Sequence, residues 1–253
     1  MDLAGKTALV TGGGRGIGRG IALALAERGA RVVVTGRTAS ELGAVAAETG
    51  GDAVVVDLAD RAALGRAVGG VAASHGRVDI LINNAGVATA APLARSGDDD
   101  WDQAFAVNVT APFLLARALV PSMVEAGWGR VVTVASNAGL TGYAYTAAYG
   151  ASKHAVVGLT RALAVELART GVTVNAVCPG FVDTRMSAEA AARIALTTGR
   201  SQDEARQALA QMSPQRRLMT VGEVVHLVLS LLPDEARGVN GQSIALDGGQ
   251  VMP

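Results

Sequence analysis

The sequence predicts an α/β protein: a single domain over residues 1–253, with a doubly wound sheet of seven mainly parallel strands and helices on both faces. Short β-branched runs alternate with segments of helical period along the chain, the pattern of parallel strands joined by helices. Half of the residues are apolar and 32 are glycine, which suits buried strands and tight strand-to-helix turns. Right-handed connections then place helices on both faces of one sheet.

Seven runs rich in valine, isoleucine and leucine are bounded by glycine and polar residues, as buried strands are. The expected strands cover residues 6–12, 30–37, 51–58, 78–86, 129–136, 172–180 and 243–249.

Helices are expected between these strands because apolar residues recur there at helical spacing. One stripe comprises Ile17, Ile21 and Leu25, and a later one Val156, Leu159, Leu163 and Leu167. The longest interruption of the strand-helix alternation, about residues 185–215, is helix-prone, polar on one side and placed before the last helix. We predict that it forms a helical lid.

Charge and composition argue against several classes of partner. The 22 basic side chains balance 22 acidic ones, so no net field attracts nucleic acid or an anionic membrane. Cys178 is the single cysteine and lies in an apolar run, where a small buried side chain is expected rather than a nucleophile. The chain starts without a basic, apolar leader, and no apolar run approaches bilayer length. We therefore expect a cytoplasmic protein with no nucleic-acid or membrane partner.

No metal site is predicted. The three histidines are scattered, without carboxylates or cysteines at ligand spacing. The acidic run Asp98–Asp100 precedes an expected helix, where carboxylates cap free N–H groups and complement the helix dipole.

The first functional motif is TGGGRGIG, residues 11–18, between the first strand and the first helix. Glycines let the backbone turn sharply and approach a pyrophosphate, whose charge the helix N-terminus stabilises. The pattern of Gly12, Gly16 and Gly18 is G-x-x-x-G-x-G and departs from the G-x-G-x-x-G fingerprint. Its strand-turn-helix context nevertheless predicts a Rossmann-type dinucleotide site.

The end of the second strand indicates which nicotinamide cofactor binds. An acidic residue there would favour the ribose of NAD, and an arginine would favour the added phosphate of NADP. Gly36 occupies the expected acidic position and Arg37 follows it, with Arg15 in the glycine loop as a second candidate. These arginines favour NADP(H) over NAD(H), although both can also be read as solvated surface residues.

From end to end the chain resembles the short-chain dehydrogenase/reductase family. The motifs that carry this resemblance are TGGGRGIG (11–18), NNAG (83–86), Asn108 in VNVTAPF, Ser136 in VASNAG, YGASK (149–153) and PGFVDT (179–184). NGQSIALDGG (240–249) also resembles the last strand of that family. The resemblance implies an NAD(P)-dependent oxidoreductase.

All three tyrosines of the chain fall between residues 143 and 149, and only Tyr149 has a lysine four positions later. Residues i and i+4 share one face of a helix, so the Lys153 ammonium is expected beside that phenol and to lower its pKa. Tyr149 is thus the predicted general acid for carbonyl reduction and the base for the reverse reaction. Ser136 is expected to end the fifth strand and to polarise the substrate carbonyl.

The resemblance implies further roles residue by residue. Lys153 would also hold the nicotinamide ribose, and Asn108 would position a water in a proton relay, although an isolated asparagine there reads as a structural amide. Asp57 would bind the adenine amino group, Asn84–Gly86 would line the adenosine ribose, and Thr184 would hold the carboxamide. The complete expected cofactor set is Gly12, Arg15, Gly16, Ile17, Gly18, Arg37, Asp57, Leu58, Asn84, Ala85, Gly86, Tyr149, Lys153, Pro179, Gly180, Val182 and Thr184.

The substrate pocket is expected to be largely apolar, which suits an acyl chain or an alicyclic ketone. Its predicted lining comprises Ser136, Leu140, Tyr143, Tyr145, Phe181 and Met186, with Val87 and Met212 nearby. For Tyr143 and Tyr145, packing beneath the lid is an alternative.

The resemblance is closest to 3-oxoacyl thioester and polyketide ketoreductases, which favours reduction of a 3-oxoacyl thioester, on acyl carrier protein or CoA, with NADPH. One departure weakens carrier docking: Gly127 and Trp128 stand where carrier-dependent relatives usually have a basic residue. A secondary alcohol dehydrogenase acting on a free cyclic or aromatic substrate is the alternative, and a non-catalytic nucleotide-binding scaffold a remote one. The family also implies a homotetramer.

Overall fold

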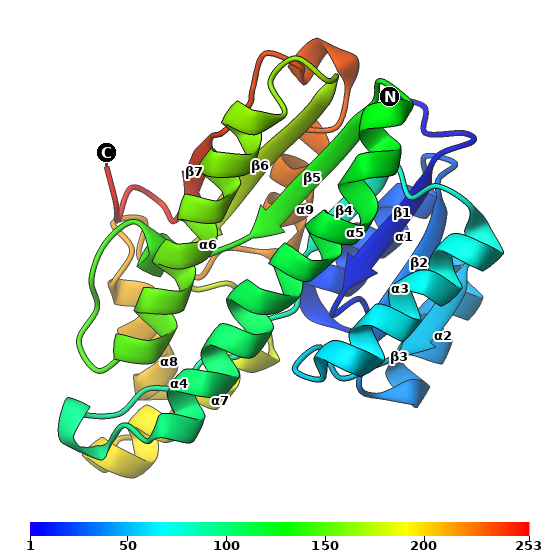
Figure 1. The fold of residues 1–253 in the computed structure, drawn as a ribbon. Coiled ribbons are helices and arrows are strands. Elements are labelled where there is room, and N and C mark those ends of the chain that lie inside the picture. The colour runs from blue at the N-terminus through cyan, green and yellow to red at the C-terminus, as the bar shows by residue number, and fades with distance from the viewer. Residues whose placement is uncertain (253) are drawn as a thin grey trace.

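The computed structural model describes residues 1–252 and contains one sheet of seven strands, all paired in parallel, in the order β3-β2-β1-β4-β5-β6-β7 (Figure 1). The predicted doubly wound α/β fold is therefore confirmed. The strands are β1 Thr7–Thr11, β2 Arg31–Gly36, β3 Asp52–Val55, β4 Ile80–Asn83, β5 Gly129–Val134, β6 Val172–Pro179 and β7 Ser243–Leu246.

Helices occupy the segments between the strands, as the apolar stripes predict. They are α1 Gly16–Ala26, α2 Ala39–Thr49, α3 Arg61–His75, α4 Asp98–Phe105, α5 Ala111–Glu125, α6 Ala147–Glu166, α7 Arg185–Thr198, α8 Gln202–Gln211 and α9 Val221–Ser230. A π turn, Ala106–Thr110, joins α4 to α5, and short 3-10 turns form at Leu93–Arg95, Asn137–Gly139 and Asp234–Ala236.

Alternate strand residues enter two cores because side chains of a strand point to opposite faces. Ala8 and Val10 of β1 join the core beneath α1, α2 and α9, whereas Leu9 joins the core beneath α3, α5 and α6. The sheet is thus covered on both sides, and its carboxyl edge is left for a site.

The segment predicted to form a lid contains α7 and α8, which lie beyond the carboxyl ends of the strands (Figure 1). The two helices share a small apolar cluster of their own, built on Ala191, Ala205 and Leu209. Phe181 and Leu218, at the two ends of the segment, pack against that cluster. Val182 pairs with Met219 in an isolated parallel bridge, so both ends are fixed at one place.

Two local expectations are wrong: no acidic side chain caps the helix that follows the acidic run, and one apolar helical stretch does reach the length of a membrane span. The helix after the acidic run begins at Asp98 with Gly97 at its N-cap, and no side chain there makes a capping hydrogen bond. Asp98, Asp99 and Asp100 instead occupy the first turn, where their charges complement the dipole. The continuous helical stretch Asp98–Glu125 is also long and apolar enough to cross a membrane by length and composition, but half of its most apolar window is buried, as in a helix that packs on a sheet.

Candidate active site

The four residues predicted to be catalytic come from three elements around the carboxyl end of β5. Ser136 follows β5, Tyr149 and Lys153 occupy successive turns near the start of α6, and Asn108 lies in the π turn between α4 and α5. The Lys153 Nζ lies 5.7 Å from the centroid of the Tyr149 ring. The i, i+4 spacing therefore brings the cation to the phenol, as predicted.

Lys153 is buried, with 5% of its surface exposed. Its Nζ donates a 3.2 Å hydrogen bond to the carbonyl oxygen of Val134. Burial lowers the pKa of Lys153 to about 8, against a smaller raising effect of Cys178. The ammonium is thus held in an environment that disfavours its charge.

The pKa of Tyr149 departs from the expectation. It is raised, because desolvation of the phenol outweighs a hydrogen bond with Ser136 that lowers it. The amino group of Lys153 lies near the ring, but it is not among the groups that shift this pKa. The phenol is therefore held in its protonated form, the form that can donate a proton.

Asn108 is fixed on three sides. Its Oδ1 accepts a 3.0 Å hydrogen bond from the main-chain N–H of Val87, and its Nδ2 donates to the Val87 carbonyl at 3.0 Å and to Ser152 Oγ at 2.9 Å. The Ser152 hydroxyl donates in turn to the carbonyl of Tyr149 at 2.7 Å. Asn108 is thus a structural amide that also connects the π turn to α6. Sequence reasoning did not identify Ser152, although it lies within the YGASK motif.

Ser136 does not end β5, because the strand stops at Val134. The serine instead begins the 3-10 turn Asn137–Gly139, and its Oγ accepts a 3.1 Å hydrogen bond from the N–H of Ala138. A methyl group on Gly139 would lie 2.7 Å from the carbonyl oxygen of Lys153. The close contact places the turn directly against α6.

The glycine loop is tied to the NNAG motif. Asn84 Nδ2 donates to the carbonyls of Thr11 at 2.9 Å and Gly12 at 3.2 Å, while the Thr11 hydroxyl accepts from the N–H groups of Asn84 and Ala85, both at 3.0 Å. A methyl group on Gly18 would overlap the Gly12 carbonyl and the Asn84 amide. The Asn84 side chain thus shapes the loop, a role that its motif did not reveal.

The geometry of the loop fits a dinucleotide. Helix α1 begins at Gly16, which has a φ of 53° that an L side chain rarely adopts, and its first turn contains no acidic residue. The Thr184 methyl carbon lies 3.6 Å from where a Cβ would stand on Gly16, so PGFVDT borders the glycine loop. A methyl group on Gly86 would lie 3.3 Å from Asn108 Oδ1 and 3.5 Å from Lys153 Nζ. The predicted cofactor segments thus border one another and the residues predicted to be catalytic.

The predicted cofactor residues outside the glycine loop lie in different environments. Leu58 and Val182 are buried in the two cores beneath the helices. The Thr184 hydroxyl donates to the Val182 carbonyl at 3.3 Å. The Asp57 side chain is exposed and accepts from the N–H of Ala59 at 3.0 Å.

The two arginines expected to recognise phosphate lie at the surface. Arg15 is at the N-cap of α1, with its NH1 3.7 Å from Glu41 Oε1. Arg37 follows β2 and is exposed. Both therefore occupy the carboxyl edge of β1 and β2, and both are accessible to a ligand there.

The predicted pocket residues separate into different environments. Leu140 packs with Val156, Val157 and Cys178, and Phe181 with the α7–α8 cluster. Tyr143 is half-buried; burial and the charge of Asp247 raise its pKa to about 12, against a smaller lowering effect of Asn137. Tyr145, with a φ of 68°, is 65% exposed, as are Met186 and Met212 at 45% and 41%.

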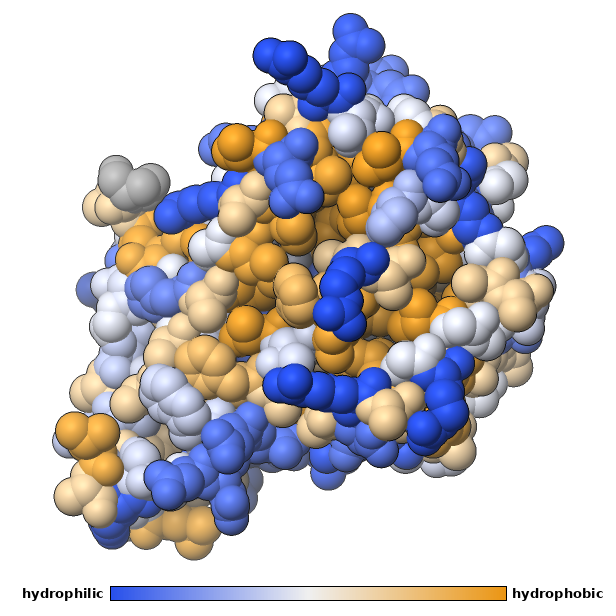
Figure 2. Space-filling model, in the orientation of Figure 1, coloured by the Kyte–Doolittle hydropathy of each residue, from blue (hydrophilic) through white to orange (hydrophobic). Residues whose placement is uncertain are grey.

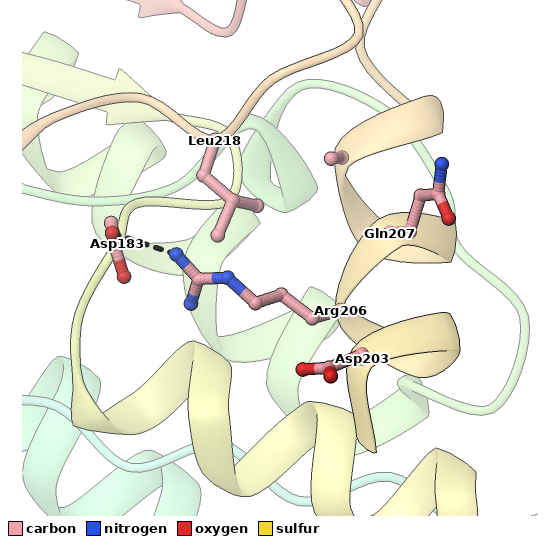
Figure 3. Close-up of a pocket in the computed structure, with 6 residues that line it drawn as sticks. Asp183, Asp203, Arg206, Gln207 and Leu218 are labelled. Carbon is pink, nitrogen blue, oxygen red and sulfur yellow. Dashed lines mark hydrogen bonds and ion pairs between the residues drawn. The ribbon is translucent and has the colours of Figure 1, made fainter. Parts of the chain in front are cut away.

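A hollow of about 300 Å³ lies between α8 and the segment that follows β6 (Figure 3). Arg206 extends across it from α8, and its guanidinium pairs with Asp183 at 2.8 Å. Leu218 lies above this pair and Asp203 beside it (Figure 3). The ion pair links the predicted lid to the PGFVDT segment.

Within residues 1–252, no group of three histidine, cysteine, aspartate or glutamate side chains is placed to hold a metal.

Comparison with known proteins agrees with this geometry. Residues 6–214 match the family described as short chain dehydrogenase. The chain is 36% identical to the 3-oxoacyl-[acyl-carrier-protein] reductase FabG of Escherichia coli (strain K12), over 100% of both chains. It is 35% identical to the D-beta-hydroxybutyrate dehydrogenase of Rhizobium meliloti (strain 1021), over 96% of this chain and 98% of that one.

A solved structure is similarly close. The chain resembles a single-substitution variant of actinorhodin polyketide ketoreductase with NADPH at a TM-score of 0.93 and 36% identity, over 97% of each chain. The similarity covers the sheet, the glycine loop and the segments that contain Ser136, Tyr149 and Lys153. The chain therefore belongs to the short-chain dehydrogenase/reductase family and is an NAD(P)-dependent oxidoreductase.

Proposed function

We propose that the protein is an NADPH-dependent reductase that converts a ketone into a secondary alcohol, with a 3-oxoacyl thioester as the favoured substrate. The observation that carries this proposal is the meeting of Tyr149, Ser136 and Lys153 beside the dinucleotide loop. A protonated phenol, a hydroxyl and a buried cation at one sheet edge are the groups that carbonyl reduction requires.

In this reaction the cofactor supplies a hydride to the carbonyl carbon. Tyr149 donates its phenolic proton to the carbonyl oxygen, and the Ser136 hydroxyl donates a hydrogen bond to the same oxygen. The cation of Lys153 stabilises the phenolate that remains until the phenol is reprotonated. Asn108 holds the main chain at Val87 and the Ser152 hydroxyl, and thereby fixes the turn of α6 that contains Tyr149. The hydride and the proton together convert the ketone into the alcohol, so the reaction is balanced.

The names of the relatives and the apolar lining of the site both favour a thioester substrate. The FabG relative is named for a 3-oxoacyl substrate, and the related structure is a polyketide ketoreductase. Leu140 and Phe181 supply apolar surface near the reacting groups, which suits an acyl chain. Trp128 lies between two cations, with Lys6 Nζ 3.9 Å and the Arg130 guanidinium 4.4 Å from its ring. Gly127 and Trp128 themselves offer no basic side chain to a carrier protein, which favours acyl-CoA.

Arg15 and Arg37 support NADPH as the cofactor. Both stand at the carboxyl edge where the adenosine ribose of a dinucleotide lies, and β2 ends in Gly36 without the carboxylate that NAD favours. A 2′-phosphate would find two exposed guanidinium groups there; Arg15 lies 3.7 Å from Glu41 and would exchange that carboxylate for the phosphate.

A homotetramer in the cytoplasm is part of the proposal. Helices α5 and α6 lie on the face seen in Figure 2, which has broad apolar areas. On these two helices Phe113 and Val165 are 42% and 80% exposed. A second copy would cover these side chains.

The second candidate is oxidation of a secondary alcohol, which the named D-beta-hydroxybutyrate dehydrogenase relative favours. The same residues serve that direction, with Tyr149 as the base, and the substrate would be a small hydroxy acid or a cyclic or aromatic alcohol.

One comparison separates the candidates. NADPH oxidation is followed with acetoacetyl-CoA and with a free cyclic ketone at matched concentration, and each is repeated with NADH. The proposal predicts faster turnover of the thioester and a preference for NADPH. Turnover of the free ketone alone, or of an alcohol with NAD, would overturn the thioester assignment.

A further inference from the structure

Asp247, directly after β7, lies 3% exposed at the meeting point of several segments that surround the site. Its carboxylate accepts hydrogen bonds from the N–H groups of Gly249 at 3.1 Å, Gln250 at 3.0 Å and Val251 at 3.0 Å. Three main-chain donors on one carboxylate form a rigid turn. The last described residues of the chain are thereby folded back onto the sheet edge.

A fourth hydrogen bond leads from this turn to the catalytic serine. Asn137 Nδ2 donates to Asp247 Oδ2 and to Gln250 Oε1, both at 3.2 Å. Asn137 is 5% exposed and follows Ser136 directly in the chain. Because one peptide bond joins the two residues, whatever fixes the Asn137 side chain limits where Ser136 can lie.

The other restraints on the serine come from β6, from its own turn and from Tyr149, whose phenol forms a hydrogen bond with Ser136. The N–H of Ala135 donates to the Val177 carbonyl at 2.8 Å, and the Ser136 carbonyl accepts from Gly139 at 2.9 Å. These bonds fix the backbone on the β6 side and within the 3-10 turn. On the side facing β7, the described residues restrain the turn through Asn137 and Asp247.

The same carboxylate residue touches the cofactor segment. A methyl group on Gly180 would lie 2.8 Å from the Cβ of Asp247, and the Ser213 hydroxyl donates to the Asp247 carbonyl at 2.9 Å. The β7 turn thus packs against PGFVDT and against the end of the segment that contains α7 and α8.

We propose that Asn137 and Asp247 are positioning residues for the reduction: their hydrogen bond holds the Ser136 hydroxyl where it meets the substrate carbonyl oxygen. The inference rests on the proposed function of Ser136. Neither side chain touches substrate or cofactor, and both act through the serine. A displacement of about 1 Å at such a group can lower turnover by roughly a hundredfold.

The test compares Asn137→Ala in two backgrounds. In the otherwise unchanged protein, Asn137→Ala is expected to lower kcat by about 10- to 100-fold, with the affinity for NADPH, measured by nucleotide fluorescence, changed less than about twofold. In the Ser136→Ala background the same substitution should change kcat by less than about twofold, because the group through which it acts is gone. Asp247→Asn is the second variant: the amide keeps the shape of the carboxylate, but its nitrogen cannot accept the hydrogen bond from Asn137 Nδ2, so the same pattern is expected.

Asn175→Ala is the matched control. Asn175 is another buried amide, and its Nδ2 donates to the Val239 carbonyl at 2.7 Å while its Oδ1 accepts from Gln242 N–H at 3.0 Å. It lies in β6, away from the serine, and its loss should lower the melting temperature without lowering kcat of the folded enzyme. Equal losses of kcat from Asn137→Ala in both backgrounds, or a loss matched by Asn175→Ala, would overturn the proposal. A failure of the proposed function itself would appear differently, as unchanged turnover in Ser136→Ala alone.

Discussion

Lys153 Nζ lies 3.2 Å from the carbonyl oxygen of Val134, the last residue of β5, and this main-chain oxygen is its hydrogen-bond partner in the described structure. No carboxylate within residues 1–252 pairs with this buried ammonium. A buried cation without a counter-charge is costly to the fold. In the proposed function, its place beside Tyr149 serves catalysis rather than stability.

Lys153→Met is expected to abolish turnover and to stabilise the protein. The folded-state pKa of about 8 lies below the ordinary value of 10.5, so the unfolded chain binds this proton more tightly. The penalty, about 3 kcal/mol, is fully present below pH 8 and is relieved as the pH rises from 8 to 10.5. Removing the amine should therefore raise the free energy of unfolding at pH 7 by about 1–3 kcal/mol, allowing for the lost hydrogen bond. Urea unfolding measures this, and a lower stability of the variant would contradict the account.

The rate of reduction is expected to fall as the pH rises through about 8. Above that value Lys153 loses its proton and no longer stabilises the phenolate. The pKa of Tyr149 is raised by burial, so the tyrosine remains protonated in this range and does not produce the decline. The check is a pH profile of kcat for NADPH oxidation. A constant rate between pH 7 and 10 would show that the charge of Lys153 is not required.

Gly18→Ala is expected to abolish dinucleotide binding, because its methyl group would overlap the Gly12 carbonyl and the Asn84 amide. Gly43→Ala, in α2, is the matched control: nothing lies within 4 Å of its Cβ position, and alanine favours a helix by about 0.5–1 kcal/mol. Nucleotide fluorescence and thermal unfolding measure both effects. Normal NADPH affinity in Gly18→Ala would contradict the placement of the cofactor.

Arg37→Ala is expected to reduce the preference for NADPH over NADH by about tenfold. A tenfold change corresponds to about 1.4 kcal/mol, which is close to the contribution of one charge-assisted hydrogen bond. Arg31, exposed at the start of β2 and thus at the opposite edge of the sheet, provides the control substitution Arg31→Ala. The ratio of kcat/KM for the two cofactors is the measurement. An equal change in both variants would show that Arg37 is only a surface residue.

The sheet and most of its helices could be predicted from the sequence because each signal is local. The valine-rich runs of β2 and β6 and the glycines of residues 12–18 determine their own conformations. The helices of the lid region were likewise visible from composition, whereas the bounds of strands were not: the runs at 78–86 and 129–136 continue past their strands, because motif residues leave the sheet to form the site.

What the sequence could not reveal were contacts between distant residues. The attachment of Asn84 to the glycine loop and of Asn137 to Asp247 spans 72 and 110 positions. The prediction that the pKa of Tyr149 is lowered was wrong for a related reason. The i, i+4 rule places a lysine near the phenol, but it cannot weigh that charge against burial, which only the packed structure determines.

The measurement that tests the central claim most directly is the turnover of Tyr149→Phe. Its rate of NADPH oxidation with acetoacetyl-CoA should fall by at least about 100-fold, since the proton donor is gone, while NADPH still binds and the melting temperature stays within a few degrees of the unchanged protein. A variant that binds NADPH and reduces the thioester at the unchanged rate would show that another group donates the proton and that this site is not the one described.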